Sequence, residues 1–117
     1  MSDRRTFKAK IGVDLTGKEG YAVCFDTDGI NVPAGITTKC IGIIVRATTV
    51  DAEVCIHGDC AALAGGTVTA GKYLIPHTDG TVKDTASTGA EFALAFESGV
   101  AGDWAQVHVQ GANGTGA

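Results

Sequence analysis

The sequence has little charge, few aromatic residues and no excess of basic residues. Charged residues make up 19% of the 117 positions and aromatic residues 6%. Nine Lys and Arg against 13 Asp and Glu give a net charge of −4, whereas a dedicated nucleic-acid binder usually carries a basic face. With 44% hydrophobic residues, the chain is also unlike an intrinsically disordered one. Composition and length therefore predict one folded domain that does not bind nucleic acid.

Long apolar runs are absent as well. The longest, residues 40–45, is far shorter than a membrane span, and no apolar stretch follows the N-terminal ten residues as it would in a secretory signal. We therefore expect no membrane contact. Without a signal, the four cysteines are expected to be reduced core residues, although a disulfide through Cys24 or Cys40 stays open. They are Cys24, Cys40, Cys55 and Cys60.

Glycine and β-branched residues are abundant, whereas leucine is rare. The 17 glycines are about twice the average usage, and short apolar runs alternate with turn signals along the whole body of the chain. No window shows a helical period, so an all-β domain of eight or nine short strands is predicted, either a small β-barrel or a β-sandwich. The expected strands are residues 21–25, 30–32, 40–50, 54–57, 60–63, 73–75, 81–83, 92–96 and 104–110.

The two ends differ from this body, which is expected over residues 11–110. Residues 1–10 are polar and basic and are expected to form an arm, with a strand beginning at Phe7 as an open alternative. The basic residues of the arm are Arg4, Arg5, Lys8 and Lys10. Residues 111–117 contain only Gly, Ala, Asn and Thr, which cannot offset the entropy of ordering, so a flexible tail is expected.

One group of side chains could hold a metal. If Gly58 and Asp59 form a two-residue hairpin turn, Cys55, His57 and Cys60 share one face of the hairpin, and all three are zinc-type ligands. However, their spacing matches no established zinc pattern and no fourth ligand is indicated. We expect a packed or partly exposed hairpin face and no metal. The diagonal placement also disfavours a disulfide between the two cysteines.

No other motif carries chemistry. Ser87 and Ser98 lack the surroundings of a nucleophile elbow, and Asp26 begins no complete calcium loop. Residues 65–72 have the wrong spacing for a phosphate-binding loop. We read His77 as a loop residue and His108 as a surface or interface residue. The sequence therefore predicts no catalytic residue and no cofactor.

Several short motifs follow one another in a definite order. A Gly-apolar-apolar run and a Val-rich strand are followed by an A-G-x-x-L step, by D-G-x-V, by a strand of A-L-x type and by G-D-x-x-x-V-x-V. The segments that contain them are ITTKCIGIIV (36–45), AEVCIH (52–57), AGGTVTAGKYL (64–74), DGTV (79–82) and FALAFESGVAGDWAQVHV (92–109). This order resembles that of the capsid cement, or head decoration, proteins of tailed bacteriophages. The cysteines, Trp104 and the C-terminal tail lie outside the pattern.

This resemblance implies a non-enzymatic structural protein of the virion, made in the host cytoplasm. Such proteins are compact β domains that bind the outer capsid surface, often as trimers, and bridge subunits of the major capsid protein. The expected contributors to binding are Arg4, Arg5, Phe7, Lys8 and Trp104, although Trp104 suits the core equally well. A strand added by the arm to a shell protein is one way to bind, in which case deletion of residues 1–10 abolishes binding and leaves the fold intact. The alternative is a carbohydrate-binding or adhesive β module.

Overall fold

The computed structural model describes residues 5–10, 14–26, 29–32, 40–77, 80–84 and 91–110. These residues form strands, turns and loops and no helix, so the described part contains no helix that could cross a membrane. The all-β prediction is confirmed. The strands are β1 (Arg5–Lys10), β2 (Ala22–Asp26), β3 (Gly29–Asn31), β4 (Gly42–Ala47), β5 (Asp51–Leu63), β6 (Tyr73–Pro76), β7 (Val82–Asp84), β8 (Ala93–Ala95) and β9 (Trp104–Val109).

All nine strands belong to one curled sheet in which every strand pairing is antiparallel. The strand order is β3-β2-β4-β5-β9-β8-β6-β7, and β1 pairs with the first part of β5. Four of the pairings join strands that follow one another in the sequence: β2 with β3, β4 with β5, β6 with β7, and β8 with β9.

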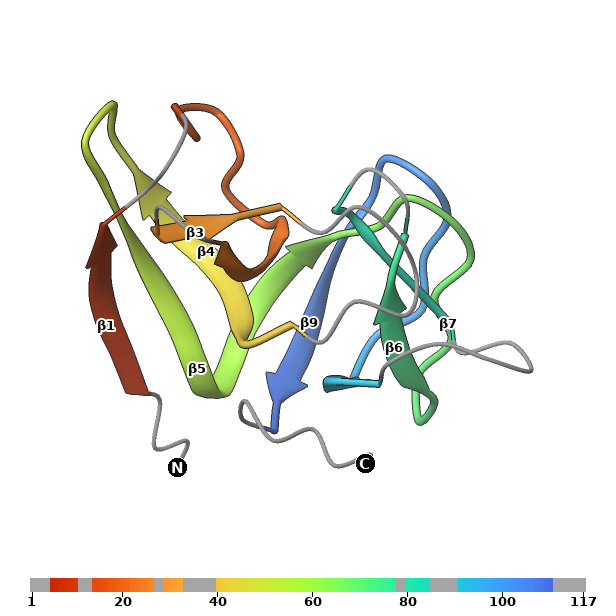
Figure 1. The fold of residues 1–117 in the computed structure, drawn as a ribbon. Coiled ribbons are helices and arrows are strands. Elements are labelled where there is room, and N and C mark those ends of the chain that lie inside the picture. The colour runs from red at the N-terminus through yellow and green to blue at the C-terminus, as the bar shows by residue number, and fades with distance from the viewer. Residues whose placement is uncertain are drawn as a thin grey trace.

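β5 is the organising element of the sheet. Its first half lies between β4 and β1, whereas its second half pairs with β9. Figure 1 shows that the strand is bent into a V, with β1 along one arm and β9 along the other. At the bend Gly58 has a φ of 103°, which strongly favours glycine. The hairpin predicted at Gly58 and Asp59 is therefore wrong. Gly58 instead bends one long strand, because β1 and β4 pair with the first half of β5 and β9 pairs with the second half.

Two apolar cores lie on opposite faces of β2, β4 and the first half of β5. On one face Ile44 and Val54 pack with β1 and β3, and on the other Ile43 and Cys55 pack with β6 to β9. Ile43 and Ile44 are both buried, so this part of β4 is covered on both faces. Strands of this kind read as continuous apolar runs rather than alternating ones.

Residues 5–10, assigned to the arm by the sequence, form β1 and pair with β5 along its length. Ala9 is buried opposite Ala52, while Lys8 is exposed opposite Glu53. The basic character of this segment comes from one face of a strand, which conceals the apolar contact on the other. Residues 1–4 and the tail expected over 111–117 lie outside the described residues.

Candidate interaction surface

Trp104 is the first residue of β9 and lies opposite Leu63 of β5. It is 54% exposed, which decides between the two roles left open by the sequence in favour of the surface. One side of its ring nevertheless packs against Gly20, so closely that a Cβ at Gly20 would lie 2.5 Å from ring atom Cζ3. Gly20 has a φ of 88°, so both its conformation and its neighbour require glycine. The indole is thus positioned and exposed at once.

The outward side of β6, β8, β9 and the second half of β5 carries large apolar side chains, and we call it the aromatic face. Strand register places its residues in three rows, because residues opposite each other in an antiparallel pair share a face. The first row is Tyr73, Leu94, His108 and Asp59, the second is Phe96, Gln106 and Ala61, and the third is Trp104 and Leu63. Three of its aromatic residues, Tyr73, Phe96 and Trp104, are between 43% and 54% exposed.

Strand β8 and the first two residues of β9 turn small residues inward and large residues outward. Ala93, Ala95 and Ala105 are buried in the core, whereas Leu94 and Phe96 alternate with them on the outward side. A monomeric domain usually places its bulkiest apolar residues inside. Large apolar residues gathered on a half-exposed sheet face are typical of an interaction surface.

A polar cluster lies within the aromatic face. His108 Nδ1 is 2.9 Å from Asp59 Oδ1, and the His108 ring contacts those of His57 and Phe96, with centroids 5.4 and 6.1 Å away. The carboxylate and the two neighbouring rings fix the orientation of the imidazole. His108 therefore lies at the surface, as its strand pattern predicted.

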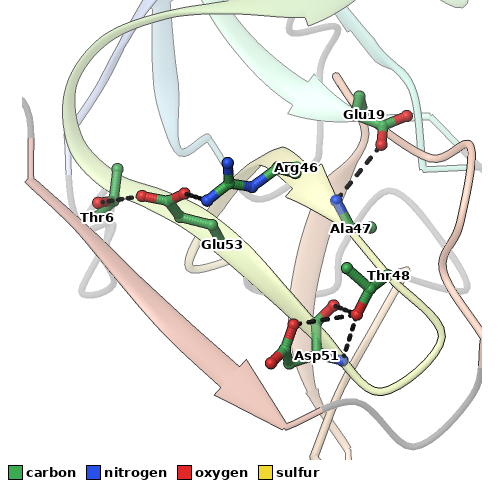
Figure 2. Close-up of polar contacts among 7 residues, drawn as sticks. All are labelled: Thr6, Glu19, Arg46, Ala47, Thr48, Asp51 and Glu53. Atoms are coloured by element: carbon green, nitrogen blue, oxygen red, sulfur yellow. Dashed lines mark hydrogen bonds and ion pairs between the residues drawn. The ribbon is translucent and has the colours of Figure 1, made fainter.

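The other end of the sheet presents a different surface. There Arg46 of β4 donates to Glu53 Oε1 at 2.9 Å, and the Thr6 hydroxyl donates to Glu53 Oε2 at 2.9 Å (Figure 2). Thr48 and Asp51 close the β4–β5 turn through further hydrogen bonds, also drawn in Figure 2. These polar groups satisfy one another, and exposed ion pairs of this kind contribute little to stability.

The structure does not bring the five predicted binding residues together. Lys8 is exposed on β1, and Arg5 and Phe7 occupy β1 positions opposite His57 and Val54. Trp104 begins β9, which pairs with the second half of β5, and Arg4 is outside the described residues. Sequence reasoning missed the aromatic face itself. Its signal was the alternation of alanine with Leu or Phe over residues 92–96, which does not reveal which side is buried.

The hairpin face predicted for Cys55, His57 and Cys60 does not form. Both cysteines are buried in the same core, while His57 is exposed on the opposite side. The Cys55 thiol donates to the carbonyls of His57 and Gly58 at 3.5 and 3.8 Å, so it supports the bend in β5. In the part of the chain that the structure describes, no three His, Cys, Asp or Glu residues are placed to hold a metal ion.

The four cysteines carry thiols. Cys40, Cys55 and Cys60 are core residues as predicted, whereas Cys24 is half-buried and lies outside both cores. Burial, with a smaller contribution from nearby Cys24, raises the pKa of the Cys40 thiol to about 12. Because only the thiolate is alkylated, we expect iodoacetamide at pH 8 to label half-buried Cys24 at least about tenfold faster than Cys40 in the folded protein. Peptide mass spectrometry over time measures both rates. Urea should equalise them, and equal labelling of the folded protein would contradict the buried position of Cys40.

Comparisons with known proteins bear on the fold. Neither known family models nor curated proteins match the sequence. In structure, the chain is similar to the N base of head fiber gp8.5 of bacteriophage phi29, with a TM-score of 0.60 at 15% identity. The match covers 92% of this chain and 95% of that one. The chain thus shares its fold with a bacteriophage head protein, in agreement with the resemblance found in its sequence motifs.

Proposed function

We propose that this chain is a structural protein of a bacteriophage head. It attaches to the outer surface of the assembled capsid and bridges subunits of the major capsid protein. The observation that carries the proposal is the fold shared with the phi29 head fiber base over nearly the whole of both chains. The order of motifs in the sequence, which resembles that of head decoration proteins, supports it independently.

Stabilisation of a shell requires binding and no reaction. A protein that binds the assembled lattice but not separated subunits favours the lattice by mass action. Many copies on one shell act together, so each contact can be modest. The aromatic face offers the apolar area for such contacts, and the proposal assigns no catalytic step and no cofactor to the chain.

The proposal includes a homotrimer and two groups of contact residues. Trp104 contributes from the aromatic face, whereas Arg4, Arg5, Phe7 and Lys8 contribute from β1 and the residues before it. β1 pairs with β5, and among the described residues no other strand pairs with it. An edge of this kind can accept a strand from a partner.

A carbohydrate-binding module is the second candidate, and one observation favours it. Aromatic residues do not cluster in the sequence, yet Tyr73, Phe96 and Trp104 share one sheet face. Exposed aromatic rings combine apolar faces with polar neighbours such as Gln106, as ligand sites do. A glycan array separates the candidates, because the head protein is expected to bind no glycan.

Co-sedimentation with heads tests the leading proposal. The test uses expanded heads of the phage whose genome carries the gene for this chain, and these heads are prepared without the protein. The purified chain should pellet with them. Light scattering should report a trimer of the chain in solution. Removing residues 1–4 should weaken binding and leave the melting temperature unchanged, whereas removing residues 1–10 should also lower it, because β1 is lost. Failure of the full chain to bind such heads would reject the proposal.

A further inference from the structure

Charge is distributed unevenly between the two parts of the chain. Residues 1–57 contain seven Lys and Arg and seven Asp and Glu, whereas residues 58–117 contain two and six. The whole net charge of −4 therefore belongs to the second part, which forms most of the aromatic face. The part of the chain that carries the aromatic face is therefore net negative, whereas residues 1–57 carry no net charge.

Three carboxylates lie within or beside the aromatic face. Asp59 is in its first row, Glu97 follows Phe96, and Asp103 precedes Trp104. Glu97 Oε1 accepts a hydrogen bond from the backbone N–H of Gln106 at 2.8 Å, and Asp103 Oδ2 accepts one from the backbone N–H of Val100 at 3.0 Å. Among the described residues no Lys or Arg side chain pairs with any of the three, and Asp59 lies 2.9 Å from His108 Nδ1. The charge of Glu97 and Asp103 therefore remains available to a partner.

We propose that the aromatic face docks onto a head-protein surface that is apolar at its centre and carries Lys or Arg at its rim. This inference rests on the function proposed above and names the surface and the chemistry of its partner. Trp and Tyr are enriched among the residues that dominate binding energy, and such residues lie at the centre of an interface with a polar rim around them. Trp104 and Phe96 supply the centre, and Glu97 and Asp103 supply the rim.

A second copy of this chain is disfavoured as the partner that binds the aromatic face. Two copies related by a twofold axis would bring one acidic rim against the other, and juxtaposed like charges disfavour association. Nucleic acid is disfavoured for the same reason, because its phosphates would meet Glu97 and Asp103. A basic protein surface matches both the apolar centre and the acidic rim.

Binding of single variants to heads tests the inference. Phe96→Ser and Trp104→Ala should each weaken co-sedimentation about 30-fold or more. Val50→Ser is the matched control, because Val50 is 70% exposed on the β4–β5 turn of the other arm, and it should bind as the original chain does. Trp104→Ala also removes the contact with Gly20 and can lower the melting temperature. In that case the binding of Phe96→Ser decides the test.

The acidic rim is tested by amide variants of Glu97 and Asp103, which remove the charge and keep a side-chain oxygen as hydrogen-bond acceptor. Glu97→Gln with Asp103→Asn should weaken binding about tenfold at low salt and flatten its salt dependence, whereas Glu53→Gln on the other arm should do neither. If the original chain binds heads and all face variants bind equally well, this inference is wrong and the proposed function stands. If the original chain does not bind, the proposed function itself fails. Loss of a solution oligomer in Phe96→Ser would show instead that a second copy occupies the face.

Discussion

Replacing Gly42 with alanine is expected to lower the free energy of unfolding by about 3 kcal/mol. Gly42 lies in β4, where a Cβ would overlap the carbonyl of Cys55 and lie 2.9 Å from the Val54 side chain. The obstacle on β5 is backbone in the middle of the sheet, so it cannot rotate away as a flexible side chain would. The φ of Gly42 is not in the left-handed region, so glycine is needed there only because a side chain has no space. Urea unfolding followed by circular dichroism measures the loss.

Gly71→Ala is the matched control for this change. Gly71 has a φ of 90° but open space around its Cα, so alanine there costs the backbone conformation alone, about 1 kcal/mol. The close approach of β4 and β5 would be contradicted if Gly42→Ala were as stable as Gly71→Ala.

Truncating Phe92 to alanine is expected to remove about 3 to 5 kcal/mol of stability, a large share of what a domain of this size has. Phe92 is 1% exposed and belongs to the core enclosed by β5 to β9. Its backbone is held on both sides, since its amide donates to Leu74 and its carbonyl accepts from Gln110, each at 3.1 Å. The structure therefore cannot close the cavity easily, and the melting temperature should fall steeply.

Phe96→Ala provides the contrast, because the same side chain is removed four residues away. Phe96 is 50% exposed on the aromatic face, so its loss should change stability by less than about 1 kcal/mol while weakening binding to heads. Similar losses of stability for both variants would show that Phe96 is packed inside, and would contradict the assignment of this face as a docking surface.

The strand pattern could be predicted where strand and turn are neighbours in sequence. The pairing of β2 with β3, and of β6 with β7, follows from short apolar runs separated by turn residues. β1 could not be assigned with certainty in the same way, because its partner residues 51–57 lie far along the chain. Lys8 and Lys10 also dominate its composition and conceal Ala9.

Gly58 shows why a local signature can mislead. Glycine with a positive φ occurs both in tight turns and at bends within a strand, and the sequence around it fits either. The choice depends on whether β9 is available to pair with residues 58–63, which is a matter of tertiary structure. The predicted grouping of Cys55, His57 and Cys60 depended on that hairpin, so it is wrong for the same reason.

The aromatic face needed the structure for a different reason. Residues 92–96 are apolar on both sides, as alanine on one and Leu or Phe on the other, so hydrophobicity alone does not assign the buried side. Packing assigns the buried side: Ala93, Ala95 and Ala105 lie in the core beneath β8 and the start of β9. The larger residues that alternate with them face outward. Trp104 could be named in advance as an interface residue by type, but its neighbours on that face could not.

A cryo-EM reconstruction of heads decorated with this chain tests the central claim most directly. The outward side of β6, β8 and β9 should lie against the shell, with Trp104 and Phe96 excluded from solvent and Lys or Arg of the head protein near Glu97 and Asp103. A decorated head in which this face points to solvent, with contact made through Arg46, Glu53 and the turn at Val50, would contradict the account.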